Sequence, residues 1–488
     1  MSQPPTPGYT TPIPAKIMTP DRVETRLGTL EFDDGRPSPD TVDRLHDFTD
    51  LMRGVQVFLD CIPAASLEAM RSGLVDNGVE ACHQVLVADE LMDSTPLFLT
   101  GNTDTVYAAG LLDLDRDGPT VVEIPPGCGP GTVNDAWFRF VVNMGAPGPD
   151  RGRGGRYLIV HEEHDGELPE GYFVARSPSF VNWLILRGFL VDGRPDAATE
   201  MFRTGLRIYP LALRDAPPEM QLSTLSGVPM NTIHANDIEF YDEIARVIDR
   251  EPVGLIDPET RGVLASIGIR KGRPFDPDDR LRATLTEAVA IGNGAARATA
   301  MAPRVPEAMI YEDRRWQTGF IGDDYRWLGG DPLGGRDHDA RTMFFYFATV
   351  NTPAMALKMV GVRSQYAIAF RDAAGEYLDG DGTYSLTLPA GVPAKDFWSV
   401  VVYDPQTRSE LQTGQPFPSR NDQRDDLTVG PDGGVVLTFA PELPDGVAES
   451  NWIQTVPGKG WFAILRLYGP LEAWFDQTWR PGDIERTA

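Results

Sequence analysis

The stretch that decides the fold lies near the end of the chain, NWIQTVPGKGWFAILRLYGP at 451–470. A second stretch of the same kind, YLDGDGTYSLTLPAGVPAKDFWSVVVYD, precedes it at 377–404. Both alternate aromatic or β-branched runs with turns rich in glycine, proline and aspartate, which is typical of strands joined by tight connections. We therefore expect residues 363–488 to form an antiparallel β-sandwich.

Another β-rich region occupies residues 96–215. Segments such as PTVVEIPPG (119–127) and GRYLIVHEE (155–163) are β-branched or aromatic, and turn residues separate them. That spacing predicts a second antiparallel sandwich. The expected fold class is α+β and mainly β, with two antiparallel β-sandwich or jelly-roll-like domains that helices separate and flank.

Helical patterns dominate the predicted middle region, residues 216–362. Asn236 and Glu239 have the spacing of a capping box, which predicts that a helix begins there. Two more helices are expected over 258–267 and 277–301, each beginning at a proline.

The N-terminal part of the chain combines a proline-rich arm with a hairpin and helical patterns. Apolar residues at helical spacing predict helices, and Pro63 is expected to break the first of them. The predicted bounds are 1–21 for an extended arm and 22–95 for the lead-in, with a hairpin at 22–36 and helices at 39–72 and 77–90.

Composition and charge argue against several classes of partner. The chain has 488 residues, and its 71 acidic and 44 basic residues give a net charge of −27. Such a surface repels nucleic acid and anionic lipid, so we expect neither as a partner. No apolar run approaches the roughly 18 residues of a membrane helix, and the first residues lack an apolar signal segment, which predicts a cytoplasmic protein. Three cysteines do not make a disulfide framework.

Short sequence motifs along nearly the whole chain resemble those of a bacterial family built from two paired domains of unknown function, DUF1254 and DUF1214. The N-terminal words include an N-x-D-T-x-Y motif at 102–107 and GYFVARSPSF at 171–180, and the middle of the chain has MNTIHANDIEFYDE at 230–243. The C-terminal words include QTGQPFPS at 412–419 and the two stretches quoted at the outset. The resemblance implies two β-sandwich, jelly-roll-like domains packed with helices, and it implies no reaction.

Two groups of polar and aromatic residues are the main site candidates. Asn102, Asp104 and Tyr107 converge at the start of a predicted strand, although Asx turns explain the first two equally well. Asp324 and Tyr325 lie in a loop with Asp323, Trp327 and Asp331, and Arg341 follows; these residues suit a cleft or a calcium-binding loop. We predict Asp104 or Asp324 as a base, Tyr107 as a proton donor, and substrate contacts from Asn102, Trp137, Arg139, Tyr325 and Arg341.

A metal site is the weakest of the candidates. His234 and Asp237 lie three residues apart and could hold zinc on one helical face, but the same residues suit a helix N-terminus. The cluster His161 to His164 does not converge on a strand, and the arginine-rich loop 148–156 lacks the order of a phosphate-binding loop. No cofactor is identified, and calcium or zinc stays open.

The motifs of serine hydrolases, HExxH metalloproteases and dinucleotide-binding enzymes do not occur in the sequence. The leading hypothesis is an enzyme that acts on a small organic or glycan-like molecule by carboxylate acid–base hydrolysis or elimination in a cleft between the domains. The alternatives are a non-catalytic ligand-binding or assembly protein and a calcium-stabilised scaffold. A homo-oligomer stays open.

Overall fold

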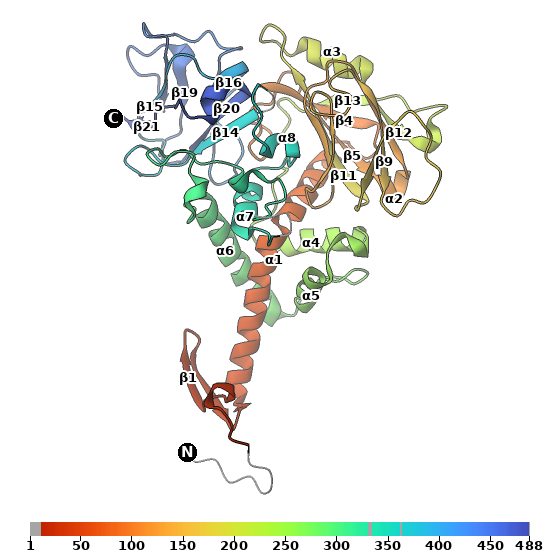
Figure 1. The fold of residues 1–488 in the computed structure, drawn as a ribbon, viewed down its shortest axis with the longest axis vertical. Coiled ribbons are helices and arrows are strands. Elements are labelled where there is room, and N and C mark those ends of the chain that lie inside the picture. Colours follow the sequence, from red (N-terminus) through yellow and green to blue (C-terminus); the bar gives the residue numbers. More distant parts are fainter. Residues whose placement is uncertain (1–10, 330–333, 362–363, 488) are drawn as a thin grey trace.

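The two β-rich regions form two sandwiches that lie side by side, with helices below and between them (Figure 1). The computed structural model describes residues 11–329, 334–361 and 364–487. Residues 1–10 of the predicted arm and Asp331 lie outside the described residues. The α+β prediction with two sandwiches is confirmed, and the sheets are mostly antiparallel.

The N-terminal sandwich packs a six-stranded sheet on a four-stranded sheet. Its core contains Val106 and Leu184 from the first sheet, and Val122 and Tyr157 from the second. The pairs β4–β13 and β9–β10 are parallel, which departs from the purely antiparallel expectation. The strand order of the six-stranded sheet is β13 (Gln221–Thr224), β4 (Gln84–Val87), β5 (Thr105–Asp113), β11 (Val181–Phe189), β7 (Gly131–Asn134), β8 (Phe140–Met144). The strand order of the four-stranded sheet is β10 (Phe173–Ser177), β9 (Gly155–His161), β6 (Thr120–Ile124), β12 (Arg207–Pro210).

The C-terminal sandwich packs two four-stranded sheets. Val400 and Leu465 from one sheet meet Leu386 and Phe439 from the other. The pair β18–β19 is parallel and the other strand pairs of this sandwich are antiparallel. The strand order of the first sheet is β14 (Ser364–Ala369), β20 (Phe462–Pro470), β16 (Ala394–Tyr403), β17 (Ser419–Asn421). The strand order of the second sheet is β19 (Trp452–Gln454), β18 (Val435–Ala440), β15 (Tyr384–Leu388), β21 (Ile484–Arg486).

Helix α1, Pro39–Asp76, is a single helix of 38 residues whose first turns project from the body (Figure 1). The predicted break at Pro63 is wrong. A proline inside a helix loses one backbone hydrogen bond, but the residues around Pro63 are buried and the helix packs on α4, α6 and α7, which favours continuity. The Ser38 side chain caps its start by accepting a hydrogen bond from the Thr41 N–H at 3.3 Å.

The predicted helix over 77–90 is also wrong, because Gln84–Val87 forms strand β4. Its apolar residues pack within a sheet between β5 and β13. The hairpin prediction at 22–36 is confirmed by strands β1 (Arg22–Thr25), β2 (Gly28–Asp33) and β3 (Arg36–Pro37).

The middle region supplies the helical layer. The helix predicted from the capping box exists as α4, but Asn236 lies before it and Asp237 accepts the Glu239 N–H at 3.0 Å. The predicted helices at 258–267 and 277–301 are confirmed as α5 and α6. The α-helices after α1 are α2 (Leu114–Asp117), α3 (Asp196–Gly205), α4 (Glu239–Arg250), α5 (Pro258–Ser266), α6 (Asp279–Met301), α7 (His338–Phe347), α8 (Pro353–Ala356) and α9 (Glu472–Phe475).

Short 3₁₀ turns complete the helical structure, at Ala15–Ile17, Leu211–Leu213, Val253–Leu255, Pro306–Ala308, Ile321–Asp323 and Glu449–Asn451. Among the helices that the structure describes, none combines the length and the apolar character needed to cross a membrane.

Candidate functional site

A cavity of about 440 Å³ lies where the two sandwiches meet the helical layer. Its walls come from β5, β7, β8 and β11 on one side, from β14 and β20 on the other, and from α7 and α8 between them. The lining is largely apolar and rich in phenylalanine. Representative apolar residues are Phe98, Ile185, Phe320, Phe344, Phe347 and Phe370.

Strand alternation explains why β11 faces both a core and the cavity. Side chains two residues apart on a strand share a face. Ile185, Arg187 and Phe189 line the cavity, whereas Leu184 and Leu186 pack into the core of the N-terminal sandwich. Strand β11 therefore contributes every second side chain to the cavity.

Strand β20 has the same division. Ile464, Arg466 and Tyr468 line the cavity, and Leu465 and Leu467 pack into the core of the C-terminal sandwich. An arginine thus occupies the cavity face of each sandwich, at the middle position of its lining triplet.

The two arginines mark the polar part of the cavity wall. The Arg187 guanidinium lies over the Tyr107 ring at 5.4 Å, and the Arg466 guanidinium lies 5.4 Å from the centre of the Tyr366 ring. Tyr468 and Asn102 line the same cavity. Cationic groups stacked on aromatic rings keep their hydrogen-bond donors at the ring edge available for a ligand.

Arg466 is held rigidly by backbone and hydroxyl oxygens. It donates to the Thr100 carbonyl at 2.8 Å, the Gly101 carbonyl at 3.2 Å and the Tyr403 hydroxyl at 2.6 Å. Thr100 adopts φ 41, a left-handed conformation that non-glycine residues rarely take. A strained residue at a ligand cavity is a recurrent feature of functional sites.

The hydroxyl groups in this region hold their protons at neutral pH. Burial raises the pKa of Tyr107 and of Tyr468, and for Tyr468 the nearby Asp104 adds to the increase. Burial disfavours the charge of Arg466, and its hydrogen bonds to the Thr100, Gly101 and Tyr403 oxygens offset part of this cost. The cavity wall therefore offers cations and neutral hydroxyl donors.

The N-x-D-T-x-Y word folds as a tight turn at the entrance to β5. The Asn102 side-chain oxygen accepts the N–H groups of Asp104 at 2.9 Å and Thr105 at 3.2 Å, and its amide donates to the Tyr107 hydroxyl. The Asx turn considered from the sequence is thus present, and Asn102 and Tyr107 also line the cavity.

Asp104 joins the two sandwiches. Its carboxylate is fully buried and accepts hydrogen bonds from Ser399, from Asn421 at 3.0 Å and from Tyr468 at 3.0 Å. All three donors belong to the C-terminal sandwich. In addition, the Thr103 and Ser419 hydroxyls lie 2.7 Å apart across the same boundary. These contacts fix the two halves of the cavity wall relative to each other.

Two family models match the chain, DUF1254 over residues 83–210 and DUF1214 over residues 363–472, and both describe domains of unknown function. The chain belongs to the two-domain DUF1254/DUF1214 family. The DUF1254 match contains Asp104 and Arg187, and the DUF1214 match contains Arg466. The cavity therefore lies between the two domains that define the family.

Two solved structures show similarity to the chain. The VPA0106 protein from Vibrio parahaemolyticus is 18% identical, with 90% of this chain and 100% of that chain covered and a TM-score of 0.54. An uncharacterized protein from Burkholderia cenocepacia is 14% identical, with 92% and 90% covered and a TM-score of 0.40. No curated protein matches the chain. The Vibrio structure shows a shared fold.

The second predicted group lies outside the cavity lining. Asp324 pairs with Arg326 at 3.1 Å, which lowers the pKa of its carboxyl against the opposing effect of burial. Arg341 pairs with Asp60 of α1. The ring of Tyr325 contacts Phe140 at 5.8 Å. The structure therefore does not bring Asp324 and Arg341 together with Asp104 at the cavity.

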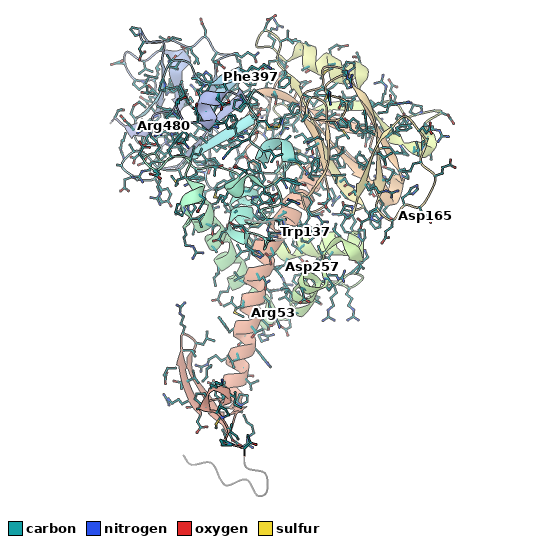
Figure 2. The ribbon with its side chains drawn as sticks, viewed as in Figure 1. Arg53, Trp137, Asp165, Asp257, Phe397 and Arg480 are labelled. Atoms are coloured by element: carbon teal, nitrogen blue, oxygen red, sulfur yellow. The ribbon has the colours of Figure 1, made fainter. Side chains whose placement is uncertain are left out.

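The predicted substrate residues Trp137 and Arg139 follow β7 and belong to the helical layer. Trp137 is buried and lies close to α1 (Figure 2). Arg139 pairs with Asp135 at 2.6 Å and donates to the Leu255 carbonyl at 3.1 Å. Neither side chain lines the cavity between the DUF1254 and DUF1214 domains.

The predicted metal residues make other contacts. His234 is buried beside the Arg408 guanidinium at 3.3 Å, and burial with this neighbouring cation lowers the pKa of its imidazole to about 3. Asp237 accepts the N–H of Glu239 at the start of α4. No group of three or more His, Cys, Asp or Glu residues that could hold a metal occurs in the described part of the chain.

Arg187, Arg466 and Tyr468 were not predicted from the sequence. A signal was nevertheless present, because the strand segments WLILRGF at 183–189 and AILRLYG at 463–469 each carry one arginine in an apolar run. Arginine is seldom buried unless something pairs with it. An isolated arginine in an apolar strand segment therefore indicates, from the sequence alone, a buried polar contact.

Proposed function

We propose that the chain binds a small, largely apolar molecule in the cavity between the DUF1254 and DUF1214 domains. The observation that carries the proposal is the cavity itself, about 440 Å³ and walled mainly by apolar side chains from both domains. Ligand cavities typically measure about 300–1,000 Å³ and combine an apolar lining with a few placed polar groups. Both properties are present here.

The lining also narrows the class of ligand. Glycans need many hydrogen-bond partners, whereas Phe344, Phe347 and Phe370 give this cavity a surface suited to aromatic or alkyl groups. A small organic molecule therefore fits the lining better than a glycan does.

The test uses the neutral fluorophore N-phenyl-1-naphthylamine, whose emission rises in apolar surroundings. Gly319 lines the cavity, and a Cβ atom built there meets no atom within 4 Å, so Gly319→Phe is expected to occupy the space without displacing a neighbour. The matched control is Gly262→Phe, a position on α5 where a Cβ also meets no atom within 4 Å.

We expect saturable binding to the unaltered protein and to Gly262→Phe, and at least about tenfold weaker binding to Gly319→Phe, a loss of about 1.4 kcal/mol. Equal binding by the two variants, or no saturable binding by any of the three proteins, would rule out the cavity as a ligand site.

A carboxylate acid–base reaction at the same cavity is the second candidate. It is favoured by one contact, in which Tyr468 lines the cavity and donates to Asp104 at 3.0 Å. Against it, the Asp104 carboxylate already accepts three close hydrogen bonds, and a base needs a free lone pair within reach of the substrate. Once a ligand is identified, unchanged turnover in Asp104→Asn would exclude the base role.

A further inference from the structure

The charges on the cavity wall are not balanced. Neither Arg187 nor Arg466 forms an ion pair with a carboxylate among the described residues. Among the described residues that line the wall, the other charged side chains are Lys395 and Asp396, which lie 3.9 Å apart and together carry no net charge. The wall therefore holds two positive charges in excess, on a protein whose net charge is −27.

Burial makes the unpaired state of Arg466 costly. Its side chain is 6% exposed, and its Nε atom has no hydrogen-bond partner. Desolvating a charge is unfavourable unless an opposite charge or further hydrogen bonds compensate. Asp104 accepts from Ser399, Asn421 and Tyr468, and neither it nor Glu410, a buried carboxyl that also interacts with Arg466, forms an ion pair with Arg466.

The two arginines line one cavity from different domains, and each lies against a tyrosine ring of its wall, Arg187 over Tyr107 and Arg466 over Tyr366. Tyr366 and Tyr468 complete this end of the wall. Guanidinium groups match the geometry of a carboxylate, and Asp104 already accepts the Tyr468 proton, so the two guanidinium groups are the donors for the ligand.

We propose that the ligand is an apolar carboxylic acid bound as its anion, with the carboxylate held between Arg187 and Arg466 and the apolar body among the phenylalanines. This inference rests on the proposed function and adds the chemical class of the ligand. The carboxylate supplies the counter-charge that the wall lacks, and the phenylalanine-rich remainder of the cavity accepts an alkyl or aryl body.

The experiment compares two dyes that share one ring system and differ in charge. 1-Anilinonaphthalene-8-sulfonate is the 8-sulfonated derivative of the neutral N-phenyl-1-naphthylamine, and its anionic sulfonate takes the place of the carboxylate. Hydrogen bonds to a charged group are worth about 1.5–3 kcal/mol, so we expect the anion to bind at least about tenfold more tightly than the neutral dye. Binding of both dyes is measured by fluorescence titration at low salt, with Gly319→Phe to subtract binding outside the cavity.

The deciding variant is Arg187→Gln, because Arg187 is half-buried and its side chain interacts with the neighbouring Tyr107 rather than with the backbone carbonyls that hold Arg466. The matched control is Arg156→Gln on β9, an exposed arginine that also stacks on a tyrosine, Tyr172, at 4.9 Å. Arg466 is left unchanged, since it bonds to two backbone carbonyls. Arg187→Lys restores the charge without the planar guanidinium.

We expect Arg187→Gln to reduce the preference for the anion by about tenfold, Arg156→Gln to leave it unchanged, and Arg187→Lys to recover part of it. Saturable binding of both dyes with equal affinity would overturn the carboxylate inference and leave the proposed function standing. Tighter binding of the neutral dye, or an unchanged preference in Arg187→Gln, would overturn it as well. Absence of saturable binding by either dye would refute the proposed function itself.

Discussion

Replacing Asp104 with alanine should loosen the junction between the two sandwiches. This carboxylate accepts hydrogen bonds from three buried side chains of the C-terminal sandwich, those of Ser399, Asn421 and Tyr468. Alanine would leave these donors without an acceptor. A buried donor without its partner costs about 1–3 kcal/mol, and some of the three can find other acceptors or water. We therefore expect a loss of about 3–6 kcal/mol in the free energy of unfolding.

Asparagine at position 104 is a gentler change. It keeps one acceptor oxygen of nearly the same shape but places an NH₂ group where the other oxygen accepts, so we expect a loss of about 1–3 kcal/mol. The matched control is Asp324→Ala, because Asp324 is the other predicted base. Its ion pair with Arg326 is local and partly exposed, and should contribute no more than about 1 kcal/mol.

The measurement is urea denaturation followed by tryptophan fluorescence, with a second probe to show whether both sandwiches unfold together. The order of stability should be unaltered protein, then Asp324→Ala, then Asp104→Asn, then Asp104→Ala. If Asp104→Ala is within about 1 kcal/mol of Asp324→Ala, the contacts of Asp104 do not hold the domains together and the reasoning fails.

Two further predictions concern a buried acid and a glycine. Burial, with Asp104 nearby, raises the pKa of Glu410 well above 4.5, and neither carboxyl oxygen has a hydrogen-bond partner in the described residues. The native state therefore keeps a proton that the unfolded state releases above about pH 4.5, so stability falls as pH rises, by up to about 1.4 kcal/mol per unit. Glu410→Gln lacks this effect, and its stability relative to the unaltered protein should increase from pH 5 to pH 8; a difference that is constant with pH would contradict the assignment. Gly145 has φ +70, and a Cβ there would lie 1.9 Å from the Gly129 carbonyl oxygen, so Gly145→Ala should lose at least about 2 kcal/mol in thermal or urea unfolding. Gly78→Ala, with φ +91 and no atom within 4 Å, is the control and should lose about 1 kcal/mol; equal losses would show that the close contact relaxes freely.

The sequence predicted the elements whose signals are local. The strand at 462–470 follows from an aromatic and apolar run between turn residues, and the helices at 258–267 and 277–301 follow from an initial proline and helical spacing. The error at Pro63 has a tertiary cause, because burial of the surrounding helix against α4, α6 and α7 outweighs the missing hydrogen bond. Short apolar runs such as 84–87 fit helix and strand patterns alike, and only pairing with β5 and β13 decides between them.

The candidate site was predicted in part, for a similar reason. Asn102 and Tyr107 share one short word and one turn, so their proximity is visible in the sequence. Arg187 and Arg466 are 279 positions apart and line one cavity only because two sandwiches pack side by side. The grouping of Asp324 with Arg341 used nearness in sequence, and each of these residues instead forms a local or α1 ion pair.

The same packing makes the site a property of the domain pair. One arginine lies on β11 of the DUF1254 domain and the other on β20 of the DUF1214 domain, so neither domain alone presents both. The distance between them depends on the contacts of Asp104, which lies at the start of β5, the strand paired with β11, and bonds to Tyr468, two residues after Arg466 on β20. The buried contacts of Asp104 beside the cavity therefore have two effects, since they stabilise the junction and hold the two arginine-bearing strands relative to each other. This coupling gives a physical reason for the two domains to occur in one chain.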